Sequence, residues 1–584
     1  MVEKIMKWCN QNSLEISTLK TKVIFWSTTR ENKHPKSIKL DGHKIEISKT
    51  VKYLGITIDN KLKWNDHIEN VVKKSKKALF ATKRAIGSKW GISPQQMLWI
   101  YKTIIIPIIS YGSIVWAMNL TKSQIAKITP IQTMAQHMIT RCKTSTPKVL
   151  LNLLLNMAPI ELKLEETALK RALTLKTERH WNMNNYKNEK IQSTQEIIDW
   201  KLKNVIKIDP NPISDKISPF SILNKTYKIN IENRDSIQVK ECESNLLIFT
   251  DGSKNEKGNT GIGITFSEEE INEVAEPLPT HTSIYQAEAI AIWKASEIIR
   301  NKNLSNLNIE FYSDSQAVLK SLMNKHTKNE LIKMCHNSLN ELGGNNTVNL
   351  NWIPGHEGHE GNEIADYLAK KGSLKQVSNP LYNKAPFTTF INIINKHYHR
   401  SIENRFIYSD ISCEAKILTS GLVKAYKYRT NKMTNKILTL NYEKISTLIK
   451  ILSNHNNLNY HMTKTKQSYN EHCEYCTEVM KYVDYNWEEN CLETAHHILC
   501  KCSYFSNKRK EIFNKYQFDS IDDLQSSHLI NKMIKFFNNT NIFETKPQIT
   551  KRSLSPNRTL SHKTNKRRST PTQGNNNKRR RYTS

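Results

Sequence analysis

Four acidic residues lie at strand ends or in helices within a run of alternating strand-like and helical segments between residues 245 and 374. Two apolar, strand-like runs end in Asp251 and Asp314. Glu288 lies in the first turn of a segment with helical spacing, and Asp366 lies in a helix that follows a glycine-rich loop. Such alternation is typical of a mixed sheet covered by helices, whose strand ends and loops share one edge. We therefore expect the four carboxylates to converge there.

Four carboxylates at one place need a counter-charge, because like charges at close range raise one another's pKa. Divalent cations relieve this repulsion, and hard oxygen ligands suit Mg²⁺, with Mn²⁺ as a substitute. Two such ions, about 4 Å apart, can stabilise both the attacking water and the leaving oxygen in phosphodiester cleavage. The competing interpretation is that these acids are ordinary solvated residues or helix caps. It would be the better explanation for any one of them alone, but not for all four together.

The segments around these acids resemble the four signature segments of the type-1 RNase H family, in order. They are TDGS at Asp251, QAEAIAI at Glu288, YSDSQAV at Asp314 and WIPGHEGHEGNEIADYLAKKG at Asp366. The resemblance implies that the four acids bind two Mg²⁺ and that the RNA strand of an RNA–DNA hybrid is cut. It also implies that His356, in the loop before the last helix, assists proton transfer or product release, which suits an imidazole.

Substrate contacts are also expected near the first acid. Cutting RNA but not DNA requires contact with the 2′-hydroxyl, and Gly252 and Ser253 are the candidates that the resemblance suggests. Asn362 is expected to cap the last helix and to support the metal site, and it is a further candidate for substrate binding. We expect His359 to be a solvated loop residue.

The first 180 residues resemble the C-terminal portion of a reverse transcriptase from non-LTR retrotransposons. The matching segments are Leu19–Ser27, Val51–Ile68, Tyr101–Trp116, Ile131–Cys142 and Ala158–Ala172. The resemblance implies a palm-end and thumb remnant that holds duplex by its phosphates. A polymerase needs metal-binding aspartates on a segment with adjacent acids, and no such segment occurs upstream of Leu19, so we expect no polymerase activity from this chain alone and a truncated element. The alternative is an unrelated helical domain.

Five of the ten cysteines fall between Cys473 and Cys502, which favours a metal site over a disulfide framework. Cys473 and Cys476 have the two-residue gap with which both sulfurs reach one Zn²⁺. The following segment resembles the zinc segment of the same retrotransposon group, which implies that His497 and Cys502 complete one structural zinc site. The alternatives left open are Cys500, His496 and, more weakly, Cys491, and basic residues at 508–510 are expected to aid nucleic-acid binding.

Charge points to a polyanionic partner. Lys and Arg outnumber Asp and Glu by 87 to 54, for a formal net charge of +33. Eleven of these basic residues lie in 551–584, which contains no acid and is expected to be a disordered tail. We therefore expect RNA or DNA to bind basic surfaces and the zinc segment, besides the hybrid. The tail's basic runs suit nuclear import, with a cytoplasmic location as the alternative.

A membrane location is not expected. The N-terminus carries charged residues that break any signal-peptide pattern. One apolar stretch, Leu98–Met118, approaches the length of a membrane span. It contains Lys102 and Pro107, so that a buried helix pair is the better interpretation.

The sequence therefore predicts a multidomain α/β protein. Its parts are an RNase H-like mixed sheet flanked by helices, mostly helical thumb-like and C-terminal regions, and a small zinc module. The function predicted is RNA–DNA hybrid ribonuclease, and the alternative is a catalytically silent nucleic-acid-binding remnant. The expected divisions are a thumb remnant over 1–180, a linker over 181–244, an RNase H domain over 245–374, a helical connection over 375–465, a zinc segment over 466–516, a helical or polar segment over 517–550 and the basic tail over 551–584.

Overall fold

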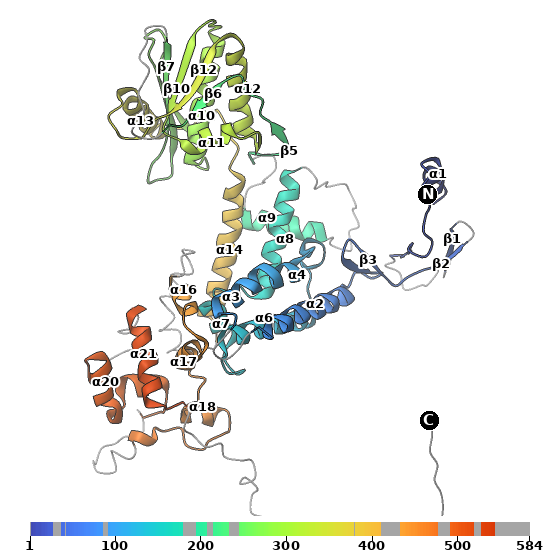
Figure 1. Ribbon diagram of the computed structural model, residues 1–584, viewed down its shortest axis with the longest axis vertical. Coiled ribbons are helices and arrows are strands. Elements are labelled where there is room, and N and C mark those ends of the chain that lie inside the picture. The colour runs from blue at the N-terminus through green and yellow to red at the C-terminus, as the bar shows by residue number, and fades with distance from the viewer. Residues whose placement is uncertain are drawn as a thin grey trace, which may run out of the picture.

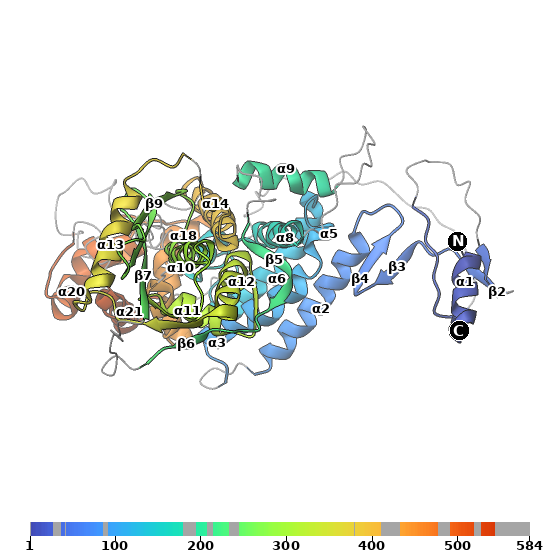
Figure 2. The same cartoon turned by 90° about the horizontal axis from the view of Figure 1, so that it is seen from above.

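The computed structural model contains a sheet domain, a helical body and a C-terminal cysteine module (Figures 1 and 2). The sheet domain comprises β5 to α13, the helical body α2 to α9 with α14 to α17, and the cysteine module the residues from α18 to α21. The predicted basic tail over 551–584 lies outside the described residues. The structure describes residues 2–26, 37–40, 43–85, 91–178, 194–206, 214–232, 245–378, 380–409, 432–476, 491–518 and 527–543.

One mixed sheet of six strands, in the order β6-β12-β10-β7-β8-β9, forms the centre of the sheet domain. Strands β6, β12, β10 and β7 run parallel to one another, and β8 and β9 are antiparallel additions. This mixed sheet confirms the predicted fold class. The strands are β6 (Lys228–Asn230), β7 (Asn245–Lys254), β8 (Thr260–Phe266), β9 (Val274–Leu278), β10 (Asn308–Ser313) and β12 (Thr347–Trp352).

Helices cover both faces of this sheet. Successive side chains of a strand point to opposite faces, and on one face Phe311 and Leu350 are buried with residues of α10, α11 and α12. On the other face Phe249 and Tyr312 stack and contact Ala365 of α13. The helices are α10 (Ile284–Asn301), α11 (Gln316–Met323), α12 (Glu330–Asn345) and α13 (Glu360–Ser373).

Glycines bring α13 into direct contact with the sheet. A Cβ placed on Gly263 of β8 would lie 2.0 Å from the Ala365 carbonyl oxygen and 2.4 Å from the Ala369 backbone nitrogen. Gly261 is just as closed, with the Ser373 nitrogen 2.2 Å from the added atom. Helix and strand backbones therefore touch here, which fixes the position of α13 and of the acid that it carries.

The helical body has two apolar cores, one around α2, α3 and α6 and the other around α7, α8, α9, α14 and α17. In Figure 1 the long helix α14 runs from the sheet domain down into this body. The helices are α2 (Asn65–Lys83), α3 (Pro94–Ile100), η1 (Tyr101–Ile105), α4 (Ile106–Ser110), α5 (Ser113–Trp116), α6 (Lys122–Thr140), α7 (Lys148–Leu154), α8 (Ile160–Thr177), α9 (Thr194–Ile206), α14 (Phe387–Ile407), α16 (Lys432–Leu438) and α17 (Tyr442–Ser453).

The apolar stretch Leu98–Met118 is divided among α3, η1, α4 and α5. Its buried residues, among them Ile105, Ile109 and Trp116, belong to the core of the helical body. Across the described ranges, no helix combines the length and apolar character that a membrane span requires. The stretch is a set of short buried helices.

The N-terminal part, as far as it is described, contains two hairpins and one helix. Val23 makes a single isolated bridge with Ile47. Figure 1 shows α1, β1 and β2 apart from the helical body. The elements are α1 (Val2–Gln11), β1 (Ser37–Leu40), β2 (His43–Glu46), β3 (Thr50–Tyr53) and β4 (Ile56–Asp59).

The interval 181–244 holds more structure than the predicted linker. Its described residues form α9 and two strands, β5 (Lys216–Ile222), which pairs with β11 (His326–Asn329), and β6. Strand β6 pairs in parallel with β12 and becomes the edge of the main sheet. With only three residues in a polar setting, β6 is too short for alternation to reveal it.

Aromatic packing joins the last described helix to the cysteine module. Phe536 and Phe537 of α21 pack against the cysteine residues, while Ile530 and Ile534 of the same helix belong to the core of the helical body. The segment predicted as helical or polar over 517–550 thus holds a helix with an apolar face. The elements are α18 (Asn459–Lys464), η3 (His497–Lys501), η4 (Ser503–Phe505), α20 (Ser506–Phe513) and α21 (Ser527–Thr540).

Candidate active site and metal centres

Three of the predicted acids meet beside the carboxyl end of β10, although β7 continues past Asp251 to Lys254. Each of Asp251, Glu288 and Asp314 offers one oxygen, and these atoms all lie within 4.8 Å of one another. Strands β7 and β10 are parallel neighbours, with Thr250 opposite Ser313, so the aspartates that follow lie side by side. Glu288 comes from α10, the next helix along the chain.

A glycine lets α10 approach β7 closely. A Cβ on Gly252 would lie 2.5 Å from the Glu288 backbone nitrogen and 2.8 Å from Ala287. Close packing is thus a sufficient reason for glycine at this position, and its predicted contact with substrate remains a prediction. Ser253 is half-buried and pairs with Gly261 along the strand.

The electrostatics of the cluster favour a bound cation. Burial, followed by the charges of Asp314 and Asp366, raises the pKa of Asp251 to about 7. Burial and the charge of Asp251 raise the pKa of Glu288 well above its usual value. The Glu288 Oε2 atom is buried and has no hydrogen-bond partner within the described part of the chain. A hard divalent cation would satisfy this oxygen and neutralise the cluster.

The fourth predicted acid is not part of the group of three. Asp366 instead forms an ion pair with Lys370 Nζ, at 2.5 Å, one turn further along α13. It is still near enough to raise the pKa of Asp251 and Asp314. The lysine lies at the i, i+4 spacing that brings side chains together on a helix, a spacing that permits this pair but does not decide which conformation the two side chains adopt.

His356 lies in the loop between β12 and α13, with a backbone φ of 61°. Burial raises the pKa of Asp314, and the charge of His356 opposes that effect. A Cβ on the neighbouring Gly355 would lie 2.8 Å from Asp314 Oδ2, so the loop backbone passes close to this acid. The loop thus lies near Asp314, and the role of His356 in proton transfer or product release remains a prediction.

The predicted capping role of Asn362 is wrong. Helix α13 begins three residues earlier than a cap at Asn362 requires, with His359 at its N-cap and no side-chain cap bond. His359 thus has a structural place where we expected only a solvated loop residue. Asn362 is buried within the first turn, and its Oδ1 atom has no hydrogen-bond partner among the described residues. Its role in substrate binding stays a prediction.

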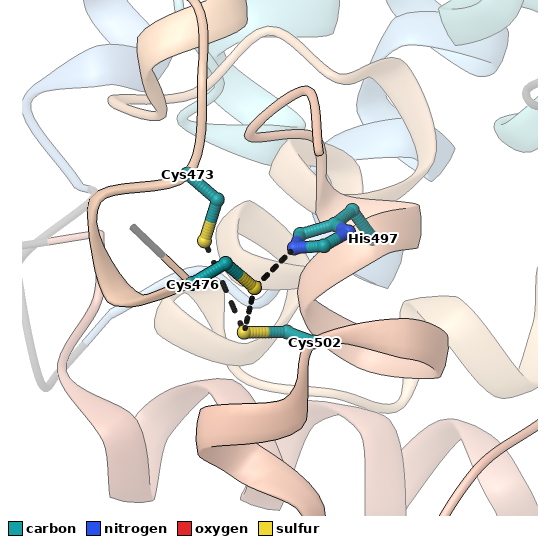
Figure 3. Close-up of side chains that lie close together, drawn as sticks. All are labelled: Cys473, Cys476, His497 and Cys502. Atoms are coloured by element: carbon teal, nitrogen blue, oxygen red, sulfur yellow. Dashed lines mark hydrogen bonds between the residues drawn. The ribbon is translucent and has the colours of Figure 1, made fainter. Parts of the chain in front are cut away.

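A second group able to hold a metal lies in the cysteine module. Figure 3 shows the side chains of Cys473, Cys476, His497 and Cys502 pointing toward one another. Cys476 Sγ lies 3.3 Å from His497 Nε2 and 3.4 Å from Cys502 Sγ. Hydrogen bonds with Cys473 and Cys502 lower the pKa of the Cys476 thiol. Buried sulfurs and one imidazole at this spacing are a donor set that suits Zn²⁺.

The alternative ligands lie outside this group. Cys500 is buried in the apolar core of the cysteine module, and Cys491 and His496 are half-buried. Of the basic residues at 508–510, which we expect to aid nucleic-acid binding, Arg509 is buried and has a structural role instead. Its guanidinium is buried and donates to the carbonyl oxygens of Cys502, Ile498 and Tyr516 at 2.5, 3.2 and 2.6 Å. Arg509 therefore fixes the turn that carries the last cysteine.

A mixed sheet with helices on both faces, and acids gathered at the ends of its central strands, defines an RNase H-like domain within this chain. Comparison with known proteins agrees, because the sequence model of the RNase H family matches residues 243–374. The domain therefore belongs to the hydrolase class of enzymes.

Curated relatives match a part of this chain. Ribonuclease H of Nitrosomonas eutropha is 29% identical over 157 residues, which cover 23% of this chain and 94% of the relative. Ribonuclease H of Ruthia magnifica is 27% identical over 139 residues, or 21% of this chain and 92% of the relative. That of Legionella pneumophila is 27% identical over 141 residues, or 21% and 94%. Nearly whole relatives thus align with a fifth of this chain.

Proposed function

We propose that this protein cuts the RNA strand of RNA–DNA hybrids, leaving a 3′-hydroxyl and a 5′-phosphate. The observation that carries this proposal is the buried group of Asp251, Glu288 and Asp314, with its unpartnered Glu288 oxygen. Three acids held this close are costly for a fold unless they hold a cation. The RNase H relatives supply the class of substrate.

Two Mg²⁺, or Mn²⁺ in their place, would supply the positive charge that activates water and stabilises the leaving oxygen. Asp251, Glu288 and Asp314 would hold one ion between them. Asp366 would contribute to the second site on releasing Lys370. Burial and the repulsion among these acids raise their pKa. Bound cations would offset the repulsion and so stabilise the charged form of the acids.

Other residues would orient the substrate and move protons. His356, near Asp314, would take a proton or assist the departure of product. Gly252 and Ser253, at the end of β7, would face the 2′-hydroxyl that distinguishes RNA from DNA. Asn362, buried in the first turn of α13, would support the site through its unpartnered amide oxygen.

Cleavage of a labelled hybrid by the full chain, with and without Mg²⁺, tests this proposal. Asp314→Asn removes one acid of the group at little cost in volume, and Glu269→Gln changes an exposed acid outside it. We expect metal-dependent cutting of the RNA strand alone, lost in Asp314→Asn and kept in Glu269→Gln. A folded chain that binds hybrid and cuts nothing would instead support the silent binding remnant.

We propose further that the chain is part of a non-LTR retrotransposon protein whose helical body binds duplex. Helix α2 exposes Lys73, Lys74 and Lys77. A groove between α2 and α6 is lined by Lys83 and Arg141 together with apolar residues. Such a surface suits phosphates, and charge reversal of the three lysines of α2 should weaken binding of duplex. The basic tail would favour a nuclear location, with the cytoplasm as the alternative.

For the cysteine module we propose one structural Zn²⁺ held by Cys473, Cys476, His497 and Cys502. Support comes from their burial and from sulfur–sulfur and sulfur–nitrogen distances below 4 Å. Zinc content of the purified chain tests this proposal, and a chain that folds without bound metal would contradict it.

A further inference from the structure

Asp215 is a buried carboxylate at the entrance to the sheet domain, with only 4% of its surface exposed. Its Oδ1 accepts a hydrogen bond from the Phe387 backbone nitrogen at 3.1 Å. Its Oδ2 accepts two more, from Asn329 Nδ2 at 3.0 Å and Gln286 Nε2 at 3.1 Å. All three donors are uncharged. In these contacts the carboxylate is therefore stabilised by N–H dipoles and not by a positively charged side chain.

Three helices begin at this carboxylate. Phe387 is the first residue of α14, and Asn329 is the N-cap of α12, whose Oδ1 accepts from the Ile332 nitrogen. Gln286 belongs to the capping box that opens α10. Helix N-termini carry partial positive charge, so three of them stabilise one buried anion without a cation. The arrangement explains why an acid is tolerated here.

The segments that enter and leave the sheet domain are also tied together at this point. The Asp215 nitrogen donates to the Ala385 oxygen at 3.0 Å, and its carbonyl oxygen accepts from the Glu330 nitrogen at 2.7 Å. Lys384 forms an ion pair with Glu330, and Lys216 lies 2.8 Å from Glu178 at the end of α8. The polar contacts thus span the boundary between the sheet domain and the helical body.

We call these contacts around Asp215 the joint. Helix α14 connects the joint to the core of the helical body. Its residues Phe390, Ile394 and Tyr398 belong to the core that α8 and α9 share. The direction in which α14 leaves Asp215 therefore fixes where the helical body lies relative to the acids of the sheet domain (Figure 1).

We propose that Asp215 is a positioning residue that holds the sheet domain and the helical body in one orientation, so that both grip the same RNA–DNA hybrid. This inference rests on the proposed function. A fixed geometry between two binding surfaces strengthens the binding of a ligand that spans both. The 21 residues of α14 are about 30 Å long. At roughly 3.4 Å per base pair, the length of this helix corresponds to about nine base pairs, and we expect a hybrid that engages both surfaces to extend by about this much beyond the active site.

Hydrogen exchange in the full chain tests the joint itself. Asp215→Asn keeps the size of the side chain but turns an amide toward the amide donors of Gln286 and Asn329. We expect faster exchange in peptides that contain the start of α14, with unchanged exchange in β10 and in the Glu269→Gln control. Faster exchange throughout the sheet domain would overturn the proposal, because Asp215 would then support the fold in general.

Kinetics with two hybrids test the consequence for binding. One hybrid covers only the sheet domain, and the other extends about ten base pairs further. We expect Asp215→Asn to raise KM for the long hybrid about tenfold, with KM for the short hybrid and both kcat values unchanged. The double variant Asp215→Asn, Asn329→Asp returns a carboxylate to the joint and should recover part of the loss.

Two results would separate failure of the joint from failure of the proposed function. An equal loss of kcat on both hybrids would overturn the joint, since Asp215 would then act on the active site through Gln286 and α10. If the unaltered chain cuts neither hybrid, the proposed nuclease function fails. The affinities for the long and the short hybrid, measured without cleavage, then test the joint. If the ratio of these two affinities is the same in Asp215→Asn as in the unaltered chain, the proposed joint is overturned.

Discussion

The Lys370 ammonium group lies 2.5 Å from the Asp366 carboxylate, on the adjacent turn of α13. The acid cluster thus contains three carboxylates that face one another and a fourth that has an internal counter-ion. A cation that needs Asp366 must displace this lysine, whereas a cation between the other three acids need not. The two proposed sites should therefore differ in affinity.

Replacing Lys370 with Gln should strengthen binding of the second cation. Lys370 is largely exposed, whereas Asp366 is half-buried, and ion pairs that water reaches from one side are worth little, so we expect a gain of about twofold to fivefold. Lys370→Arg retains the charge and should leave both affinities near their original values. Calorimetric titration with Mn²⁺ measures both steps. Equal affinities for the second ion in all three proteins would show that Lys370 does not compete with it.

Without divalent cations, the sheet domain should lose stability as the pH rises. The pKa of Asp251 is raised from 3.8 to about 7 by burial and by its acidic neighbours, so the folded state binds more protons than the unfolded chain between these values. The free energy of unfolding therefore falls as pH rises from about 4 to about 7, and Mg²⁺ should reverse the loss.

Asp314→Asn should weaken this pH dependence. It removes the charge that, after burial, most raises the pKa of Asp251, and each unit by which that pKa falls is worth about 1.4 kcal/mol. Thermal unfolding at pH 5 and pH 8, without added Mg²⁺, measures the difference. Glu269→Gln is the control with unchanged pH dependence. A variant that loses stability between these pH values as steeply as the original chain would contradict the expectation.

The meeting of Asp251 and Asp314 could be predicted from the sequence, because acids at matching positions of neighbouring parallel strands come together in a sheet of this kind, even though β7 continues beyond Asp251. It did not reveal the pairing of Asp366, which depends on which side-chain conformation meets Lys370. The error at Asn362 has a similar cause, since α13 begins without a side-chain cap and so leaves no signal. In the sequence Asp215 looks like an ordinary acid of the predicted linker. Its role depends on three helices that are distant in the sequence and meet at it only in the fold.

The cysteine module offers a test with closely matched variants. Cys502→Ser should lower zinc affinity by more than about 100-fold, because even partners outside the ligand set contribute 10-fold to 100-fold. Cys500→Ser changes a buried cysteine two residues away that lies outside the group of four. It should retain its zinc. Zinc content after dialysis measures both, and loss of metal in Cys500→Ser alone would reassign the ligand.

Gly263→Ala tests whether the contact between β8 and α13 positions the acid site. The added Cβ would lie 2.0 Å from the Ala365 carbonyl oxygen, a backbone atom that cannot rotate away, so α13 must shift as a whole. We expect a loss of about 1 to 3 kcal/mol in stability, together with weaker cation binding because Asp366 moves with the helix. Gly344→Ala is the matched control, since its added Cβ meets nothing within 4 Å near the end of α12. There alanine should stabilise the chain by about 0.5 to 1 kcal/mol. Urea unfolding of the two variants compares them directly, and equal stability would mean that strand and helix are not in contact.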